Sequence, residues 1–259
     1  MKKLADKEKI VPSKPNLWKG VGAGIHACPG CQQPTFMRII MDVIEEMDLA
    51  GKAVMVMGIG CTPLISFAGT NIDRIEGPHG RPPDMATGIK RVCPDALVFT
   101  VQGDGDLASI GAGSLIGALN RNEKLTIFMI NNANFGNTGG QMAPTTLVNQ
   151  VTTTSPYGRS VETAGYPMHT AEFMAGFKSV VYSARGSLIS PTLYQKTKKY
   201  VKTAFQKQID GAGLSFVECL AACPVNWHLT PLESLRWIED VMMMEFPVGE
   251  FKNIDKIEN

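Results

Sequence analysis

The sequence LVFTVQGDGD, residues 97–106, is an apolar run that ends in Gly103-Asp104-Gly105-Asp106. A second apolar run, Leu125–Ile130 (LTIFMI), ends in Asn131-Asn132. Short apolar runs bounded by turn residues are typical of buried strands. The 25 residues between Gly105 and Asn131 have room for one helix followed by the second strand. The sequence therefore predicts a strand–helix–strand unit in which the two strands are parallel.

The carboxyl ends of the two strands would lie at one edge of a sheet, where neighbouring strands are about 4.8 Å apart. Open parallel sheets bind ligands at this edge. Asp104 offers carboxylate oxygens and Asn132 an amide oxygen, which suit Mg²⁺ bound to a phosphate. Gly103 and Gly105 let the backbone approach an anion, and the following helix offers free N–H groups. Each motif alone is also typical of an ordinary turn, but together they predict a magnesium diphosphate site.

At this spacing, GDG followed by NN resembles the signature of thiamine-diphosphate enzymes. Residues 131–146, NNANFGNTGGQMAPTT, resemble those of the 2-oxoacid:ferredoxin oxidoreductases, and the resemblance covers nearly the whole chain. It is to the beta subunit, which carries the diphosphate half of the thiamine site. The alternation of strand and helix patterns predicts a doubly wound α/β domain, with a mostly parallel sheet and helices on both faces.

The resemblance implies roles for particular residues. Asp104 and the side chain of Asn132 would ligate Mg²⁺ together with the backbone carbonyl of Asn134. Asp106 and the turn Gly136-Asn137-Thr138 would line the diphosphate and the reacting end of the thiamine cofactor. These residues, with Gly103 and Gly105, are the predicted cofactor contacts on this side of the site.

Three residues are predicted to be catalytic. The resemblance implies that Asn137 is the polar group nearest the reacting carbon, where it would stabilise charge on the substrate oxygen. In the family an HGR like His79-Gly80-Arg81 borders the cofactor cleft, so His79 and Arg81 could meet the diphosphate or a substrate carboxylate. A lone histidine is otherwise an ordinary surface or cap residue.

Four of the six cysteines form a candidate metal-binding set. Cys28 and Cys31 form a CxxC before an amphipathic helix, Cys61 follows Gly60 at the end of an expected strand over 53–57, and Cys223 follows a late strand. Their ligand chemistry suits zinc and an iron–sulfur cluster equally well. The resemblance implies that these four cysteines hold a 4Fe–4S cluster close to the thiamine.

The other two cysteines, Cys93 and Cys219, are expected to be buried structural residues. Cysteines that form no disulfide framework suit a cytoplasmic protein, which is the expected location. The chain has 259 residues and a net charge of +1, which predicts no nucleic-acid partner, and no apolar run is long enough to span a membrane. We expect residues 1–22 to be an N-terminal arm, docked at Trp18, and residues 23–259 to be the thiamine diphosphate-binding domain with a C-terminal extension.

The resemblance implies oxidative decarboxylation of a 2-oxoacid to acyl-CoA and CO₂, with electrons passed through the cluster to ferredoxin. In thiamine enzymes a glutamate on the pyrimidine half of the site activates the cofactor. No carboxylate of this chain lies in a matching motif, so we expect an alpha subunit to supply that half and its glutamate. Gamma and ferredoxin-like delta subunits are further partners found in the family.

Two other functions are alternatives. The chain could be a subunit of a non-redox thiamine-dependent decarboxylase, in which the cysteines are idle or bind zinc. It could also be a non-catalytic subunit that only assembles a larger complex. Two departures from the family bear on the substrate: Gln32 replaces a glycine after the CxxC, and Leu64 stands where some relatives have a basic residue. Leu64 favours a monocarboxylate with an apolar tail, while the identity of the 2-oxoacid stays open.

Overall fold

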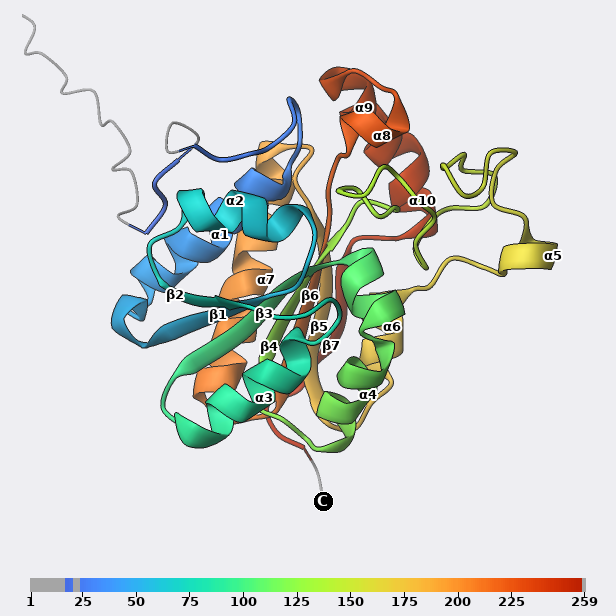
Figure 1. Cartoon of the computed structure of the whole chain (residues 1–259). Helices are drawn as coiled ribbons and strands as arrows, with labels where there is room; N and C mark the ends of the chain where they lie inside the picture. Colours follow the sequence, from blue (N-terminus) through green and yellow to red (C-terminus); the bar gives the residue numbers. More distant parts are fainter. Residues whose placement is uncertain (1–16, 21–23, 258–259) are drawn as a thin grey trace, which may run out of the picture.

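The computed structural model describes residues 17–20 and 24–257, which form a three-layer α/β domain (Figure 1). Its central sheet has the strand order β2-β1-β3-β4-β6-β5-β7. All neighbouring strands are parallel except β7, which pairs antiparallel with β5. The predicted doubly wound, mostly parallel fold is therefore confirmed. The strands are β1 (Ala53–Met57), β2 (Asp73–Glu76), β3 (Leu97–Gly103), β4 (Thr126–Asn131), β5 (Val180–Ser187), β6 (Leu214–Leu220) and β7 (Gly249–Asn253).

Helices cover both faces of the sheet. One layer contains α1 (Gln33–Glu46), α2 (Cys61–Gly69) and α7 (Pro191–Ile209). The other contains α3 (Pro82–Val92), α4 (Ala112–Asn120) and α6 (Thr170–Ala175). The shorter α5 (Val161–Ala164), α8 (Pro224–Trp227), α9 (Pro231–Trp237) and α10 (Met243–Glu245) lie beyond the carboxyl ends of the strands (Figure 1).

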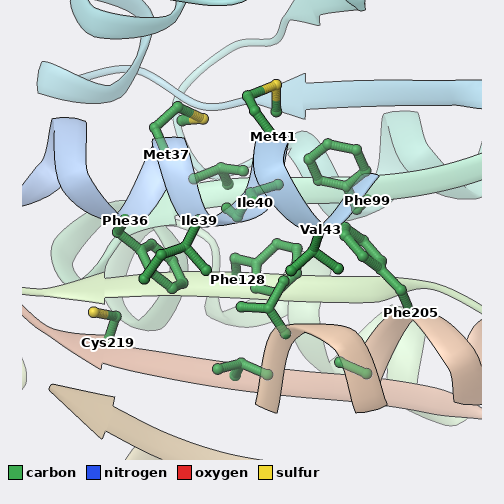
Figure 2. Close-up of a cluster of buried hydrophobic side chains, with 14 of the residues drawn as sticks. Phe36, Met37, Ile39, Ile40, Met41, Val43, Phe99, Phe128, Phe205 and Cys219 are labelled. Carbon is green, nitrogen blue, oxygen red and sulfur yellow. The ribbon is translucent and has the colours of Figure 1, made fainter. Parts of the chain in front are cut away.

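The larger core lies between the sheet and the layer of α1 and α7 (Figure 2). Phe128 of β4 is fully buried and meets Phe36, Phe99 and Phe205 edge to face, with ring centroids 5.2–5.9 Å apart. Edge-to-face packing suits the ring quadrupoles. These four rings come from two helices and two strands, so they join the layers at the centre of the domain.

The segment after Gly105 differs from the single helix that the sequence predicts. Asp106–Ile110 forms a π-helical turn, and α4 begins only after Gly111. The backbone of Gly111 lies against that of Gly80, so closely that a side chain on either glycine would collide with the other. Such π-turns occur often at functional sites. Here the turn allows the loop before α3 to pack directly over the GDG motif.

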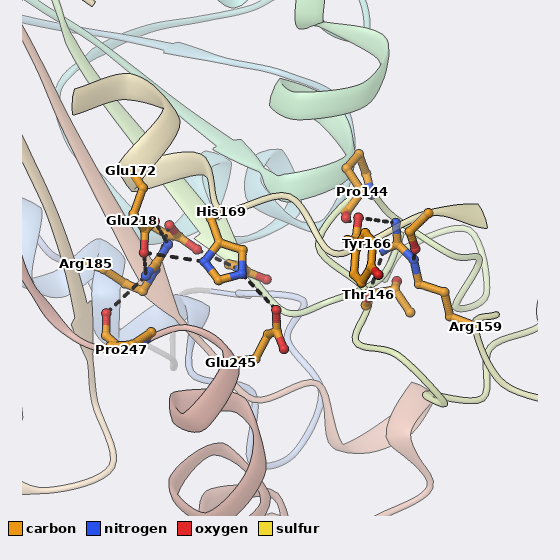
Figure 3. A network of polar contacts seen from close by, with 12 residues as sticks. Pro144, Thr146, Arg159, Tyr166, His169, Glu172, Arg185, Glu218, Glu245 and Pro247 are labelled. Atoms are coloured by element: carbon orange, nitrogen blue, oxygen red, sulfur yellow. Dashed lines mark hydrogen bonds and ion pairs between the residues drawn. The ribbon is translucent and has the colours of Figure 1, made fainter. Parts of the chain in front are cut away.

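The long polar segment after β4 is held in place by one buried arginine. Arg159 is 4% exposed, and its guanidinium donates to the carbonyls of Pro144, Thr146, Ala164, Gly165 and Tyr166 (Figure 3). These carbonyl acceptors, together with the carbonyl of Ala143 at 3.5 Å, satisfy this charged group away from water. The segment is thus a packed part of the domain and not a structureless connection.

The predictions for the N-terminal residues and for the two structural cysteines are confirmed only in part. Trp18 is buried and pairs with Thr70, as expected, whereas most of the predicted arm, 1–16 and 21–22, lies outside the described residues. Cys219 is buried as predicted. The prediction for Cys93 is wrong: it is exposed, because it caps the end of α3 before the turn into β3. Among residues 17–20 and 24–257, no helix is both long and apolar enough to cross a membrane.

We predict that Phe128→Ala lowers the free energy of unfolding by about 3–5 kcal/mol, because it removes a ring from the closely packed centre of the core and leaves a cavity. Chemical denaturation of the purified chain measures this loss. Tyr157→Ala is the matched control: Tyr157 is fully exposed, so its truncation should change stability by no more than about 0.5 kcal/mol. Equal effects of the two substitutions would contradict the assigned core.

Candidate functional site

The carboxyl ends of β1, β3 and β4 meet around a cavity, which we call the GDG cavity. β3 and β4 are paired so that Gly103 lies opposite Ile130, and this register places the residues that follow each strand side by side. The structure thus brings together the two motifs that the sequence singled out. The cavity is lined by Gln33, Ile59, Gly60, Cys61, Thr62, His79, Gly103, Asp104, Gly105, Asp106, Asn132, Asn134, Phe135, Gly136, Asn137 and Thr138.

Three oxygens converge at the floor of this cavity. The amide oxygen of Asn132 lies 2.7 Å from the carbonyl oxygen of Asn134 and 3.1 Å from a carboxylate oxygen of Asp104. Oxygens this close repel one another unless a proton or a cation lies between them. A rotated Asn132 amide would supply N–H donors, while the present orientation supplies three hard ligands for one cation. These are the three groups that the sequence resemblance predicts as Mg²⁺ ligands.

Asp104 is almost fully buried, with 1% of its surface exposed. Burial raises the pKa of its carboxyl group to about 7, and the hydroxyl of Thr145, which donates to it, opposes this rise. Removing a carboxylate from water disfavours its charged form, and a bound cation would restore that form. The site is therefore arranged to gain charge stabilisation from a positive ion.

Asp106 holds the loop of His79 against the GDG motif. One of its carboxylate oxygens accepts from the backbone N–H of Gly80 at 2.7 Å and contacts Nδ1 of His79. Its other oxygen accepts from Nε2 of Gln102 at 2.5 Å. Because Asp106 occupies Nδ1 of the imidazole, Nε2 is the ring nitrogen left for another partner. His79 thus lines the GDG cavity with a fixed ring and one available nitrogen.

Arg81 is the predicted catalytic residue that does not line this cavity. Its Nη1 donates to the hydroxyl of Ser114 at 2.8 Å and lies 3.8 Å from a carboxylate oxygen of Asp84. More than half of its side chain is exposed. Arg81 therefore lies at the start of α3, facing α4 and solvent.

A second cavity adjoins the first, and we call it the cysteine cavity. It contains all four predicted cluster ligands, and it shares Gln33, Cys61, Asn132, Gly136 and Asn137 with the GDG cavity. Its lining residues are His26, Ala27, Cys28, Cys31, Gln33, Cys61, Leu64, Ile65, Asn132, Gly136, Asn137, Cys223, Pro224, Val225 and Asn226. Four thiols from three distant segments therefore lie around one space.

Burial raises the pKa of Cys31 to about 12 and that of Cys61 to about 11, and the neighbouring cysteines add to both shifts. Burial also raises the pKa of Cys223. These thiols are protonated at neutral pH and would release protons to a metal. Within the part of the chain that the structure describes, no three His, Cys, Asp or Glu side chains converge closely enough to hold a single metal ion.

A charged network around Arg185 (Figure 3) is hydrogen-bonded to the Asn-Asn motif through Glu218. Arg185 and Glu218, both fully buried, are joined at 2.9 Å, and Arg185 also binds the carboxylate of Glu172. Glu218 accepts from the amide of Asn131, whose oxygen accepts from the N–H of Ala133. Ala133 has a φ of 55°, so this hydrogen bond supports a left-handed turn that few residues adopt readily. The network thus holds the turn that carries Asn132 and Asn134.

Several residues of the site were not identified from the sequence. Thr145 donates to Asp104, and Gln102 to Asp106. Gln33 leaves its buried side-chain oxygen without a partner at the border of both cavities. Asn226 contacts both the sulfur of Cys223 and the carbonyl of Gly136. Thr145 lies within the stretch 131–146 that carried the resemblance, whereas the other three had no signal in the sequence.

Comparison with known proteins shows the family to which this chain belongs. Residues 58–219 match the model of the thiamine pyrophosphate enzyme C-terminal TPP binding domain. The chain is 40% identical to ketoisovalerate oxidoreductase subunit VorA of Methanothermobacter thermautotrophicus over 228 residues, which are 88% of this chain and 48% of VorA. It is 32% identical to 2-oxoglutarate synthase subunit KorB of Methanocaldococcus jannaschii over 251 residues, which cover 89% of this chain and 88% of KorB.

The chain belongs to the beta subunits of the 2-oxoacid:ferredoxin oxidoreductase family. It spans about half the length of the VorA relatives that it matches. The 2-oxoglutarate:ferredoxin oxidoreductase of Magnetococcus marinus has the same fold, with a TM-score of 0.74 and 22% identity over 95% of this chain and 87% of that chain.

In this beta subunit, Gln32 and Leu64, which depart from the family pattern, lie in different surroundings. Gln32 is buried, and its oxygen accepts from the N–H of Ala222 at 3.1 Å. This hydrogen bond joins the CxxC segment to the segment of Cys223. It is a structural reason for glutamine in place of glycine at position 32. Leu64, on the first turn of α2, lines the cysteine cavity.

We predict that the beta subunit without ligands loses stability as the pH rises from about 4 to 7, through the titration of Asp104. The folded-state pKa of about 7 lies above the value of 3.8 for an exposed carboxyl group, so the folded state binds the extra proton in this window. Asp104→Asn removes this contribution. The difference in unfolding free energy, variant minus parent, should therefore increase from pH 4 to pH 8 in denaturation experiments, and a constant difference would contradict the shift.

Proposed function

We propose that this beta subunit provides the diphosphate half of a thiamine site and a 4Fe–4S cluster in an enzyme that oxidatively decarboxylates a 2-oxoacid to acyl-CoA and CO₂, with ferredoxin as electron acceptor. The observation that carries this proposal is the juxtaposition of the two cavities. One has converging oxygen ligands, the other has four thiols, and the two share five lining residues.

The residues of the GDG cavity fit a magnesium diphosphate. Asp104, Asn132 and the carbonyl of Asn134 would hold the cation, with the Asn132 amide turned so that its oxygen faces the other two oxygens. Gly105 packs against Phe135 with no space for a side chain, so the GDG turn can lie directly beside the loop that follows β4. When bound, thiamine diphosphate supplies the carbon nucleophile and electron sink for decarboxylation.

His79 and Asn137 are the proposed catalytic residues of this chain. Asp106 fixes the imidazole of His79 through Nδ1, so Nε2 can bind or transfer a proton at the diphosphate side of the cavity. Asn137 lines both cavities, and its amide can donate a hydrogen bond to an oxygen on which negative charge develops. We assign no such role to Arg81, since it is bound to Ser114 outside the cavity.

The cysteine cavity fits an iron–sulfur cluster. Cys28, Cys31, Cys61 and Cys223 are the Cys₄ ligand set that a 4Fe–4S cluster requires. Each thiolate of such a cluster binds a different iron, so the four sulfurs surround the cluster and need not converge on one point. The proximity of the cluster to the thiamine site would allow electrons to leave the reaction one at a time.

The missing half of the site is assigned to a partner. Asp104 and Asp106, the carboxylates that line the GDG cavity, are both engaged by neighbouring residues of this chain. The glutamate that activates the pyrimidine ring would therefore come from an alpha subunit. Coenzyme A, ferredoxin and further small subunits complete the proposed assembly, and Leu64 favours a 2-oxoacid with an apolar tail.

We expect the full chain, purified without oxygen, to contain about four iron atoms and four inorganic sulfides, as a 4Fe–4S cluster requires. Cys61→Ser should lose most of this iron, because Cys61 lines the cysteine cavity. Cys93→Ser is the matched control and should keep it, since Cys93 is exposed at the end of α3. Elemental analysis and a visible spectrum that bleaches with dithionite measure the outcome. Zinc in place of iron would favour the non-redox decarboxylase.

In the assembled enzyme, we expect Asp104→Ala to reduce 2-oxoacid-dependent reduction of a viologen dye by more than about 100-fold. Loss of partners one shell further from a metal already costs about 10–100-fold. Asp210→Ala, at the exposed end of α7, should retain the parental rate. Full activity of Asp104→Ala in an assembled complex would contradict a catalytic role and favour a subunit that only supports assembly.

A further inference from the structure

One side chain, Asn226, connects the cysteine cavity to the loop of the GDG cavity. Its Nδ2 donates to the carbonyl oxygen of Gly136 at 2.8 Å and to the sulfur of Cys223 at 3.4 Å. The same nitrogen lies 3.4 Å from the side-chain oxygen of Asn134. An amide nitrogen carries two N–H groups, so it can serve the carbonyl and the sulfur at the same time.

The surroundings of Asn226 fix its position. Gly140 has a φ of 78°, and a side chain there would come within 3.1 Å of Cβ of Asn226, so the turn after β4 packs directly on α8. The next residue, Trp227, donates from its indole N–H to the carbonyl oxygen of Asn132 at 3.1 Å and packs on Trp237. Two consecutive side chains of α8 are thus bonded to the loop that carries the proposed magnesium ligands.

We propose that Asn226 is a positioning residue that holds the Cys223 sulfur beside the Gly136 turn and raises the reduction potential of the cluster bound by Cys223. This inference rests on the proposed function, because it requires the 4Fe–4S cluster. Hydrogen bonds to ligand sulfurs are among the factors that set the potential of such clusters. Reduction adds one negative charge, so an N–H donor at the sulfur stabilises the reduced form more than the oxidised form.

The same contact gives Asn226 a second effect on the site. The carbonyl of Gly136 precedes Asn137, the residue proposed to meet the reacting carbon, and it is held by the amide that also meets the cluster ligand. A movement of the Cys223 sulfur would therefore change the hydrogen bond that Asn226 donates to the Gly136 carbonyl, which also accepts from the N–H of Gly139 at 3.4 Å. The geometry couples the cluster and the reacting end of the thiamine site through one amide group.

The test is a reduction potential, measured on the full chain by a redox titration followed by EPR. Asn226→Leu keeps the approximate shape of the side chain and removes the donor. We expect the reduction potential of the cluster in this variant to become more negative. A tenfold change in the one-electron equilibrium constant corresponds to a shift of about 59 mV. Asn120→Leu, the same substitution at an exposed position on α4, should keep the parental potential.

Asn226→Asp is the second variant, for the case that the leucine variant binds no iron. It keeps the size of the side chain and replaces the N–H donor with an acceptor, so its potential should also become more negative. A parental potential in an iron-loaded Asn226 variant would overturn this inference and leave the proposed function intact. Absence of iron from the unmodified chain would overturn the proposed function, and this inference with it.

Discussion

The parallel pairing of β3 with β4 is the constraint on which the candidate site depends. The register that sets Gly103 opposite Ile130 places Asp104 and Asn132 at the same level of the sheet edge. A shift of one residue would turn the alternate side chains of β4 to the other face. The ring contacts of Phe128 with Phe36 and Phe205 in the core would be lost with it. Packing in the core and the geometry of the proposed metal ligands are therefore fixed by the same pairing.

The ion pair of Arg185 with Glu218 extends this constraint into the loop that follows β4. Two buried charges are costly to remove from water, and replacement of such pairs by apolar residues is often neutral or stabilising. Here the pair has a local use, since Glu218 holds the amide of Asn131, and Asn131 supports the left-handed turn at Ala133. We infer that the charged pair is kept for the shape of this turn rather than for stability.

The two cavities are built as one unit because their walls are shared. Cys61 is the first residue of α2 and follows β1. It is one of the five residues that line both the GDG cavity and the cysteine cavity. The segments of Cys31 and Cys223 are joined by the hydrogen bond of Gln32 to Ala222. Asn226 and Trp227 then attach α8 to the loop after β4. Proposed electron transfer between the two cofactors would thus occur between segments that are joined by hydrogen bonds.

Much of this organisation follows from the sequence alone. Apolar runs predicted the strands of the sheet centre, and the spacing of Asp104 from Asn132 predicted that the two would meet, because parallel strands joined by one helix end at the same edge. Helix α2 gave no amphipathic signal, since it is apolar on most of its surface, and the edge strands β2 and β7 are short and polar. These elements were therefore not identified.

Only the tertiary structure decided which polar side chains complete the site. Thr145 and Asn226 act through contacts with residues that lie 41 and 90 positions away along the chain, whereas Gln102 contacts Asp106 within the turn that follows β3. Arg81 and His79 are two residues apart, yet only His79 lines the GDG cavity. Asp106 is hydrogen-bonded to the imidazole of His79, whereas Arg81 donates to Ser114. The sequence determined the strands and the motifs at their ends, since these depend on local apolar patterns. Side-chain partners depend on distances between segments that no local pattern encodes.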